Sequence, residues 1–148
     1  MLDNIRSLYN VGSMFRTADA FGLDQLYLCG ITGTPLDELR RTKIAKTSLG
    51  AETMVPWSYV ERIDDLLPKL KADGLEVVAL EQTPQAIPLA SYQPIPSKVA
   101  LVVGHEVFGV HSHVLSEIDQ HLMIPMLGQK ESLNVAVAFG IACAQLRA

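Results

Sequence analysis

Residues 124–148, IPMLGQKESLNVAVAFGIACAQLRA, constrain the fold more than any other stretch. An apolar strand predicted over 121–126 leads through a polar loop into a helix that starts near Ser132 and Asn134. Nearly every residue from 135 to 146 is apolar or small, so this helix is predicted to be buried all round or packed on a partner. Ser132 is the expected N-cap, and a buried Asn134 would need hydrogen-bonding partners. The helix start is a candidate ligand site, and an ordinary capped helix is the equally weighted alternative.

The composition predicts a single domain over residues 1–148. The chain is 49% hydrophobic and 19% charged, which allows a substantial core and excludes disorder. No apolar run is long enough to span a membrane, and no secretory signal is recognisable, so a cytoplasmic location is expected. Cys29 and Cys143 each lie in an apolar stretch, which predicts reduced core thiols.

Charge is distributed unevenly along the chain. The net charge of −4 argues against a protein that coats nucleic acid indiscriminately. However, no acidic residue falls between Glu38 and Glu52, and this interval holds four basic residues: Arg40, Arg41, Lys43 and Lys46. A solvated helix face explains most clusters of this kind, and a phosphate-binding patch is the alternative.

Strand-like and helix-like segments alternate. Strands are predicted at 26–29, 54–57, 76–80 and 99–103, and helices at 11–21, 36–46, 59–72 and 112–118. Because the strands are almost continuously apolar, the predicted fold class is α/β, with a mainly parallel sheet flanked by helices.

Several familiar sites are absent from the sequence. It has no P-loop motif, no G-x-G-x-x-G after the first strand, and no Ser or Cys in a nucleophile elbow. His105-Glu106 does not continue to H-E-x-x-H, because Gly109 occupies the last position. His111 and His113 are two residues apart, which predicts different helix faces, so no metal site is expected.

Residues 10–16, NVGSMFR, form a second candidate site at a predicted helix start. Asn10 is expected to cap the helix, while Gly12 leaves its first turn open to close approach by another group. Arg16 lies about one turn beyond Gly12 on the same face. A lone helical arginine is usually a surface charge, but this context favours anion binding.

Residues 104–109, GHEVFG, directly follow the predicted strand 99–103. The C-terminal ends of parallel strands are where open α/β sheets bind ligands. Gly104 and Gly109 permit a tight turn that holds Glu106, and a solvent-exposed turn carboxylate is the alternative. With the strand end at Leu80, these loops are predicted to form one pocket suited to an adenine-like face and a ribose.

Together the three stretches resemble the SpoU (TrmH-like) family of the SPOUT superfamily, S-adenosylmethionine-dependent RNA 2′-O-ribose methyltransferases. The match is N-x-G-x-x-x-R-x-A at 10–18, G-x-E-x-x-G at 104–109, and I-P-M…S-L-N-V at 124–135, and it extends over essentially the whole chain. The resemblance implies a SPOUT fold with a C-terminal deep trefoil knot, a rare exception to the rule that chains do not thread their loops. It also implies a homodimer with its active site near the interface.

The resemblance also assigns roles to individual residues. It implies an active site that contains the catalytic Arg16 together with Asn10, Glu106, Ser132 and Asn134. S-adenosylmethionine would be bound by Leu80, Gly104, Ile124, Met126 and Leu133. No separate RNA-binding extension is expected, so RNA would be contacted by a partner protein or by the chain's own basic residues: Arg6, Arg40, Arg41, Lys43 and Lys46.

The expected reaction is methyl transfer to a ribose 2′-OH, with tRNA favoured over rRNA. The hydroxyl is a poor nucleophile whose proton must be removed or polarised. Because a guanidinium stays protonated, Arg16 is expected to bind the adjacent phosphate and stabilise alkoxide charge rather than act as the base. The alternatives are a catalytically silent RNA- or cofactor-binding subunit, and a base-modifying transferase of a related branch.

Overall fold

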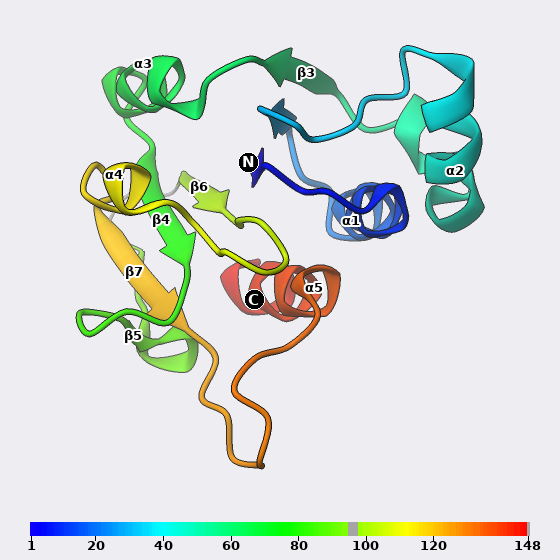
Figure 1. The fold of residues 1–148 in the computed structure, drawn as a ribbon. Coiled ribbons are helices and arrows are strands. Elements are labelled where there is room, and N and C mark those ends of the chain that lie inside the picture. Colours follow the sequence, from blue (N-terminus) through cyan, green and yellow to red (C-terminus); the bar gives the residue numbers. More distant parts are fainter. Residues whose placement is uncertain (95–97, 148) are drawn as a thin grey trace.

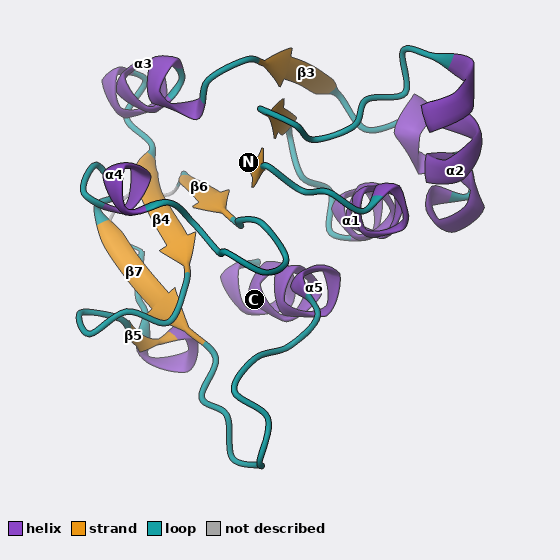
Figure 2. Cartoon of the chain, viewed as in Figure 1, coloured by secondary structure: helices purple, strands orange, loops and turns teal. Residues whose placement is uncertain are grey.

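Strands and helices alternate in the computed structural model, which describes residues 1–94 and 98–147 (Figures 1 and 2). The strands are β1 (Leu2–Asp3), β2 (Leu26–Cys29), β3 (Trp57–Val60), β4 (Glu76–Leu80), β5 (Ile87–Pro88), β6 (Val99–Val102) and β7 (Gln120–Met123). The helices are α1 (Leu8–Ala20), α2 (Glu38–Ser48), α3 (Leu67–Ala72), α4 (Ser112–Leu115) and α5 (Val135–Leu146), with short 3-10 turns at Ala51–Thr53, Ile63–Asp65 and Leu89–Ser91.

The strands form two parallel sheets that meet at β1. Their orders are β1-β2-β3 and β5-β7-β4-β6, and every pairing between these strands is parallel. The Asp3 N–H donates to the Val103 carbonyl at 2.9 Å and the Val103 N–H to the Met1 carbonyl at 3.1 Å, which joins β1 to the end of β6. The predicted α/β class with parallel strands is therefore confirmed.

Helix α1 packs between α2 and α5 (Figure 1). Gly12 is fully buried where α1 meets α2, and a Cβ there would collide with Thr47 Oγ1 and the Ile44 carbonyl. The prediction that Gly12 opens the helix to another group is thus confirmed, but that group is a neighbouring helix rather than a ligand.

The predicted helix at 59–72 and the strand at 54–57 were both wrong in their bounds. Strand β3 begins at Trp57, where it pairs with Leu26 of β2, and continues to Val60. The regular helix α3 begins only at Leu67, with Pro68 in its first turn. Proline lacks the N–H that a helix interior requires, so the helical spacing of apolar residues upstream of Pro68 does not form one continuous helix.

Helix α5 is buried on one face only. Phe139, Ala142 and Cys143 lie in the core, whereas Val137 is 52% and Ile141 42% exposed. Of the two alternatives predicted for this helix, burial all round does not hold for the single chain, and packing on a partner stays a prediction. Its apolar outer face remains uncovered.

The two cysteines are buried and unpaired, as predicted. Burial raises the pKa of Cys29 and of Cys143 to about 11, so both are inert thiols. The predicted separation of His111 and His113 was wrong, because His111 precedes α4 with extended backbone and its ring stacks on that of His113 at 5.7 Å. No helix in the described part of the chain is long and apolar enough to cross a membrane.

Candidate functional site

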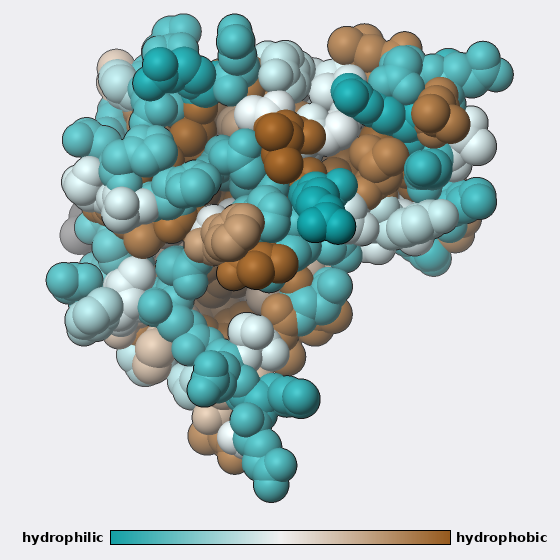
Figure 3. Space-filling model, viewed as in Figure 1, coloured by the Kyte–Doolittle hydropathy of each residue, from teal (hydrophilic) through white to brown (hydrophobic). Residues whose placement is uncertain are grey.

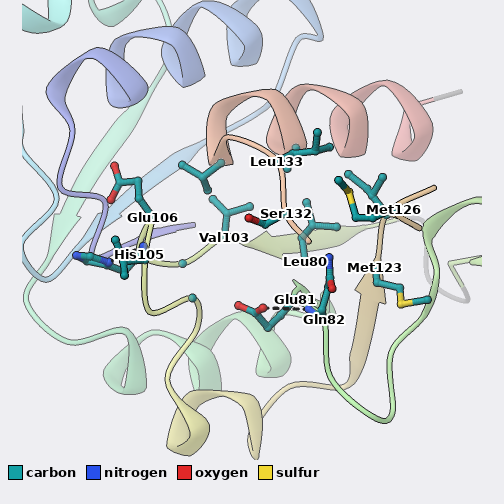
Figure 4. Close-up of a pocket in the computed structure, with 16 residues that line it drawn as sticks. Leu80, Glu81, Gln82, Val103, His105, Glu106, Met123, Met126, Ser132 and Leu133 are labelled. Carbon is teal, nitrogen blue, oxygen red and sulfur yellow. Dashed lines mark hydrogen bonds between the residues drawn. The ribbon is translucent and has the colours of Figure 1, made fainter. Parts of the chain in front are cut away.

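A cavity of about 180 Å³ opens beyond the C-terminal ends of β4, β6 and β7 (Figure 4). Figure 4 shows His105 and Glu106 at one end and Met123 and Met126 at the other. Seven residues predicted for the site line this cavity: Leu80, Gly104, Glu106, Ile124, Met126, Ser132 and Leu133. The parallel sheet therefore gathers segments that lie far apart in the sequence at one edge.

Other residues of the same cavity were missed by sequence reasoning. Glu81 and Gln82 directly follow β4, so their position after a buried strand was the signal that could have identified them. The remainder lie at the end of β7, in α5 and in the loops: Val103, His105, Val107, Gly109, Met123, Val135 and Ala138. Gly109 and Val135 are fixed positions of the sequence motifs that had been given no role in the cavity, whereas the other five carry no motif signal and are placed here only by the fold.

Glu106 is held by three hydrogen-bond donors from the start of the chain. Its Oε2 accepts from the Arg6 N–H at 2.9 Å. Its Oε1 accepts from the Ser7 N–H at 2.8 Å and from Asn10 Nδ2 at 3.0 Å. A solvent-exposed turn carboxylate, the alternative from sequence, does not describe this residue.

These donors keep Glu106 ionised. Partial burial acts to raise the pKa of the carboxyl, but the hydrogen bonds from Arg6, Ser7 and Asn10 outweigh it and hold the pKa below its ordinary value. The cavity therefore carries a fixed negative charge at one end.

Asn10 links Glu106 to the last helix. Its Oδ1 accepts from Asn134 Nδ2 at 3.2 Å, and Asn134 Oδ1 accepts from the N–H groups of Ala136 at 2.9 Å and Val137 at 3.3 Å. Asn134 thus caps α5 while also contacting Asn10. One hydrogen-bonded chain, the Glu106–Asn10–Asn134 network, runs through all three sequence motifs.

Both predicted helix caps were wrong. Ser7, not Asn10, caps α1 by accepting from the Asn10 N–H at 3.3 Å. Asn134, not Ser132, caps α5, and both are exposed in the single chain. Serine and asparagine are equally good caps, so the partner across the fold decides which residue takes the role.

The Glu106 loop is fixed by a close backbone turn. The His105 N–H donates to the Gly109 carbonyl at 3.1 Å and the Gly109 N–H to the His105 carbonyl at 2.9 Å. A Cβ on Gly104 would collide with the backbone of Gly109 and Val110. Glu81 Oε2 accepts from the Val110 N–H at 2.9 Å, which ties the loop to the end of β4.

Arg16 is not brought to this cavity. It lies six residues beyond Asn10 on α1, about 9 Å further along the axis, and does not line the cavity. Its side chain is exposed and makes no ion pair within residues 1–94 and 98–147.

The basic residues lie at two places. Arg6 is exposed beside Glu106, to which its backbone is bonded. The other four lie exposed on α2, beyond α1 from α5, and Arg40 Nε is 3.4 Å from Asp37 Oδ2: Arg40, Arg41, Lys43 and Lys46. The cluster on α2 is a solvated helix face that remains free for contact with a polyanion.

Known proteins share both the sequence and the fold. Residues 1–144 match the SpoU rRNA Methylase family. The 23S rRNA (guanosine(2553)-2′-O)-methyltransferase RlmP of Bacillus subtilis is 36% identical over 99% of this chain and 56% of its own length. The tRNA (guanosine(18)-2′-O)-methyltransferase of Aquifex aeolicus is 32% identical over 94% of this chain and 63% of its own length.

Among solved structures, the AdoMet-bound rRNA methyltransferase from Sinorhizobium meliloti superimposes with a TM-score of 0.85 at 28% identity, over 99% of this chain and 54% of that one. The chain thus spans a little over half the length of the relatives that it matches. The family match over almost every residue and the identity to RlmP lead to one conclusion. This chain belongs to the SpoU rRNA methylase family.

Proposed function

We propose that this chain transfers a methyl group from S-adenosylmethionine to a ribose 2′-OH of RNA. The observation that carries the proposal is the Glu106–Asn10–Asn134 network, which links one residue from each of the three motifs and holds Glu106 at one end of the cavity. The relatives named above are 2′-O-methyltransferases of rRNA and tRNA, which supports the same chemistry here.

The residues of the cavity fit the proposed cofactor. Apolar surface for an adenine ring is provided by Leu80, Ile124, Met126 and Leu133. Gly104 also lines the cavity, and because it has no Cβ the backbone of Gly109 and Val110 can pack against it. When bound, S-adenosylmethionine would supply an electrophilic methyl group on a sulfonium. The negative charge of Glu106 at one end of the cavity complements a cationic group.

We assign Arg16 the binding of the phosphate next to the target ribose and the stabilisation of charge on its 2′-oxygen. The guanidinium stays protonated, so it cannot remove the hydroxyl proton itself. Because Arg16 lies outside the cavity of its own chain, we propose that it serves a site completed by a second subunit. The remaining polar residues, Asn10, Ser132 and Asn134, would orient the ribose and the loops around it.

A homodimer is part of the proposal. Val137 and Ile141 leave an apolar stripe of α5 exposed to water, and an identical subunit would cover it. Arg6 and the cluster on α2 would then contact RNA phosphates, with tRNA as the proposed class.

We also propose the deep trefoil knot. After β7 the chain runs through residues 124–134, which are mostly exposed beyond Met126, and returns so that α5 packs on α1 and β4 (Figure 1). Gln82 Nε2 donates to the Glu131 carbonyl at 2.7 Å, which ties the loop after β4 to the segment before α5. An experimental structure traced through this segment tests the threading.

The activity is tested by incubating the protein with labelled S-adenosylmethionine and either total tRNA or rRNA, followed by nucleoside analysis. The expected product is a 2′-O-methylated nucleoside that is lost in Asn10→Ala. Cofactor binding without any methylated product would favour the silent-subunit alternative, and a methylated base would favour the base-modifying one.

Arg16→Lys separates the two roles of the arginine. Turnover near the unsubstituted level supports charge stabilisation, because the positive charge is retained. Loss of turnover at unchanged RNA affinity would exclude simple phosphate anchoring.

A further inference from the structure

The loop that carries Glu106 exposes two large apolar side chains. Val107 is 74% and Phe108 75% exposed, although both follow a residue of the cavity directly. Figure 3 shows apolar surface emerging near the centre of the face where Figure 1 places the loop that follows β6. Apolar groups held in water beside a functional cavity indicate a contact surface.

The loop holds Phe108 in a fixed orientation. His105 Nδ1 accepts from the N–H groups of Val107 at 3.0 Å and Phe108 at 3.3 Å. The His105 ring stacks on the Phe108 ring, with centroids 4.9 Å apart and an interplanar angle of 30°. One face of Phe108 is therefore supported by His105, and the ring remains largely exposed to solvent.

We propose that Phe108 is a stacking platform for a base of the RNA substrate, next to the ribose that is methylated. This inference rests on the proposed function. A stacked base gains from any flat π surface, and unpaired bases of RNA are commonly bound on aromatic side chains. Phe108 lies two residues from Glu106, so a base on its ring would be attached to a ribose near the cavity.

Charge favours a nucleic acid as the occupant. Arg6 is exposed beside the same loop, and within the described ranges it pairs with no carboxylate. A cation beside a supported aromatic ring matches the alternation of phosphate and base along a single strand. A purely apolar protein partner would leave the Arg6 charge without a counterpart.

Kinetics of Phe108→Ala and Phe108→Tyr test the platform. Phe108→Ala is expected to raise the KM for RNA about tenfold, since one base loses its stacking partner, with little change in kcat or in the KM for S-adenosylmethionine. Phe108→Tyr should restore the unsubstituted KM, because the ring is retained. Met54→Ala removes another exposed apolar side chain, 74% exposed, which lies between the 3-10 turn Ala51–Thr53 and β3 and does not line the cavity, and it should leave both constants unchanged.

Fluorescence tests stacking directly and without turnover. The chain has a single tryptophan, so Trp57→Phe combined with Phe108→Trp places the only indole in the loop. A short single-stranded RNA of mixed sequence should quench this indole to saturation, and poly-acidic peptide should not. The parent protein, with Trp57 in β3, is the control for quenching by RNA bound elsewhere.

Three results would overturn the platform. The first is an indole at position 108 whose fluorescence RNA does not quench, and the second is a change in KM for S-adenosylmethionine alone. The third is a Phe108→Ala protein that sediments as a monomer while its KM for RNA is unchanged. Each leaves 2′-O-methylation itself intact. Conversely, saturable quenching without any methylated product would contradict the proposed function and not the stacking surface.

Discussion

Asp3 is the last residue of β1, and Glu106 lies in the loop that follows the neighbouring strand β6, yet the pKa values of the two carboxyls are shifted in opposite directions. Asp3 is 2% exposed and accepts one hydrogen bond, from Asn4 Nδ2 at 3.1 Å, while its Oδ2 has no partner among the described residues. Burial raises the pKa of Asp3, despite opposing effects of His111 and Asn4. Glu106 is only partly buried and has three donors, which lower its pKa. The number of hydrogen-bond donors that the fold directs at each carboxylate, rather than its position in the sheet, therefore decides which of the two keeps its charge.

The two groups therefore contribute opposite pH dependences to stability. For Glu106, the contribution is present above the ordinary pKa of 4.5 and is lost as pH falls through the lowered value. For Asp3, the folded state binds the proton more tightly, so stability falls as pH rises from the ordinary pKa of 3.8 through the raised value.

The largest expected loss of stability comes from Gly104→Ala, which disrupts the turn that positions Glu106. The added Cβ would meet backbone atoms of Gly109 and Val110, which cannot rotate away. We expect a loss of about 3 kcal/mol in the free energy of unfolding. Urea denaturation measures it, and Gly128→Ala, with no atom within 4 Å of the new Cβ, is the matched control. Equal stability of the two variants would show that the backbone of the turn shifts to accommodate the added Cβ at little cost.

Next is Glu106→Gln, which preserves shape but replaces one acceptor oxygen by an amide donor. One of the donors from Arg6, Ser7 and Asn10 then faces an N–H group, and stability should fall by about 2 kcal/mol at neutral pH. The variant should also lose the part of the pH dependence of stability that Glu106 contributes as pH falls below its ordinary pKa of 4.5. Glu117→Gln, which changes an exposed carboxylate between α4 and β7, should change neither measurement.

A smaller effect of opposite sign is expected for Asp3→Asn. A neutral amide avoids the charge that burial disfavours, so unfolding at neutral pH should require on the order of 1 kcal/mol more. The gain should vanish toward pH 3, where the carboxyl of Asp3 is neutral in both states. Asp24→Asn, on the exposed surface, is the control. If Asp3→Asn instead lowered the free energy of unfolding, the ionised carboxylate of Asp3 would be stabilising the folded state.

The smallest effect on stability is expected for Arg6→Ala. Arg6 binds Glu106 through its main-chain N–H, so truncating the side chain preserves the bond and should change stability by less than about 0.5 kcal/mol. RNA binding should nevertheless weaken, with the slope of log Kd against log salt reduced by about 1. An unchanged salt slope would place the Arg6 guanidinium away from phosphate.

Much of this arrangement could be predicted from sequence. The parallel α/β class followed from apolar strands separated by helices, and the cavity followed from glycine-containing loops after β6 and β7. What pattern alone missed was decided by contacts across the fold. Residues 57–60 pair with β2 as a strand, although the apolar residues that follow have helical spacing. Asn134 rather than Ser132 caps α5, and Asn134 is also the residue that is hydrogen-bonded to Asn10. Glu81, although adjacent to a predicted strand end, acquires its contact only when Val110 folds against it.

The hydrogen bond between Asn10 and Asn134 joins residues 124 positions apart. The bond between Glu106 and Asn10 spans 96 positions. A ribosome makes the first of these residues long before the last, and contacts of such separation form late and slowly. A growing or prematurely terminated polypeptide of this kind therefore holds Asn10 without its partners. A polypeptide whose synthesis has not reached α5 therefore cannot assemble the Glu106–Asn10–Asn134 network.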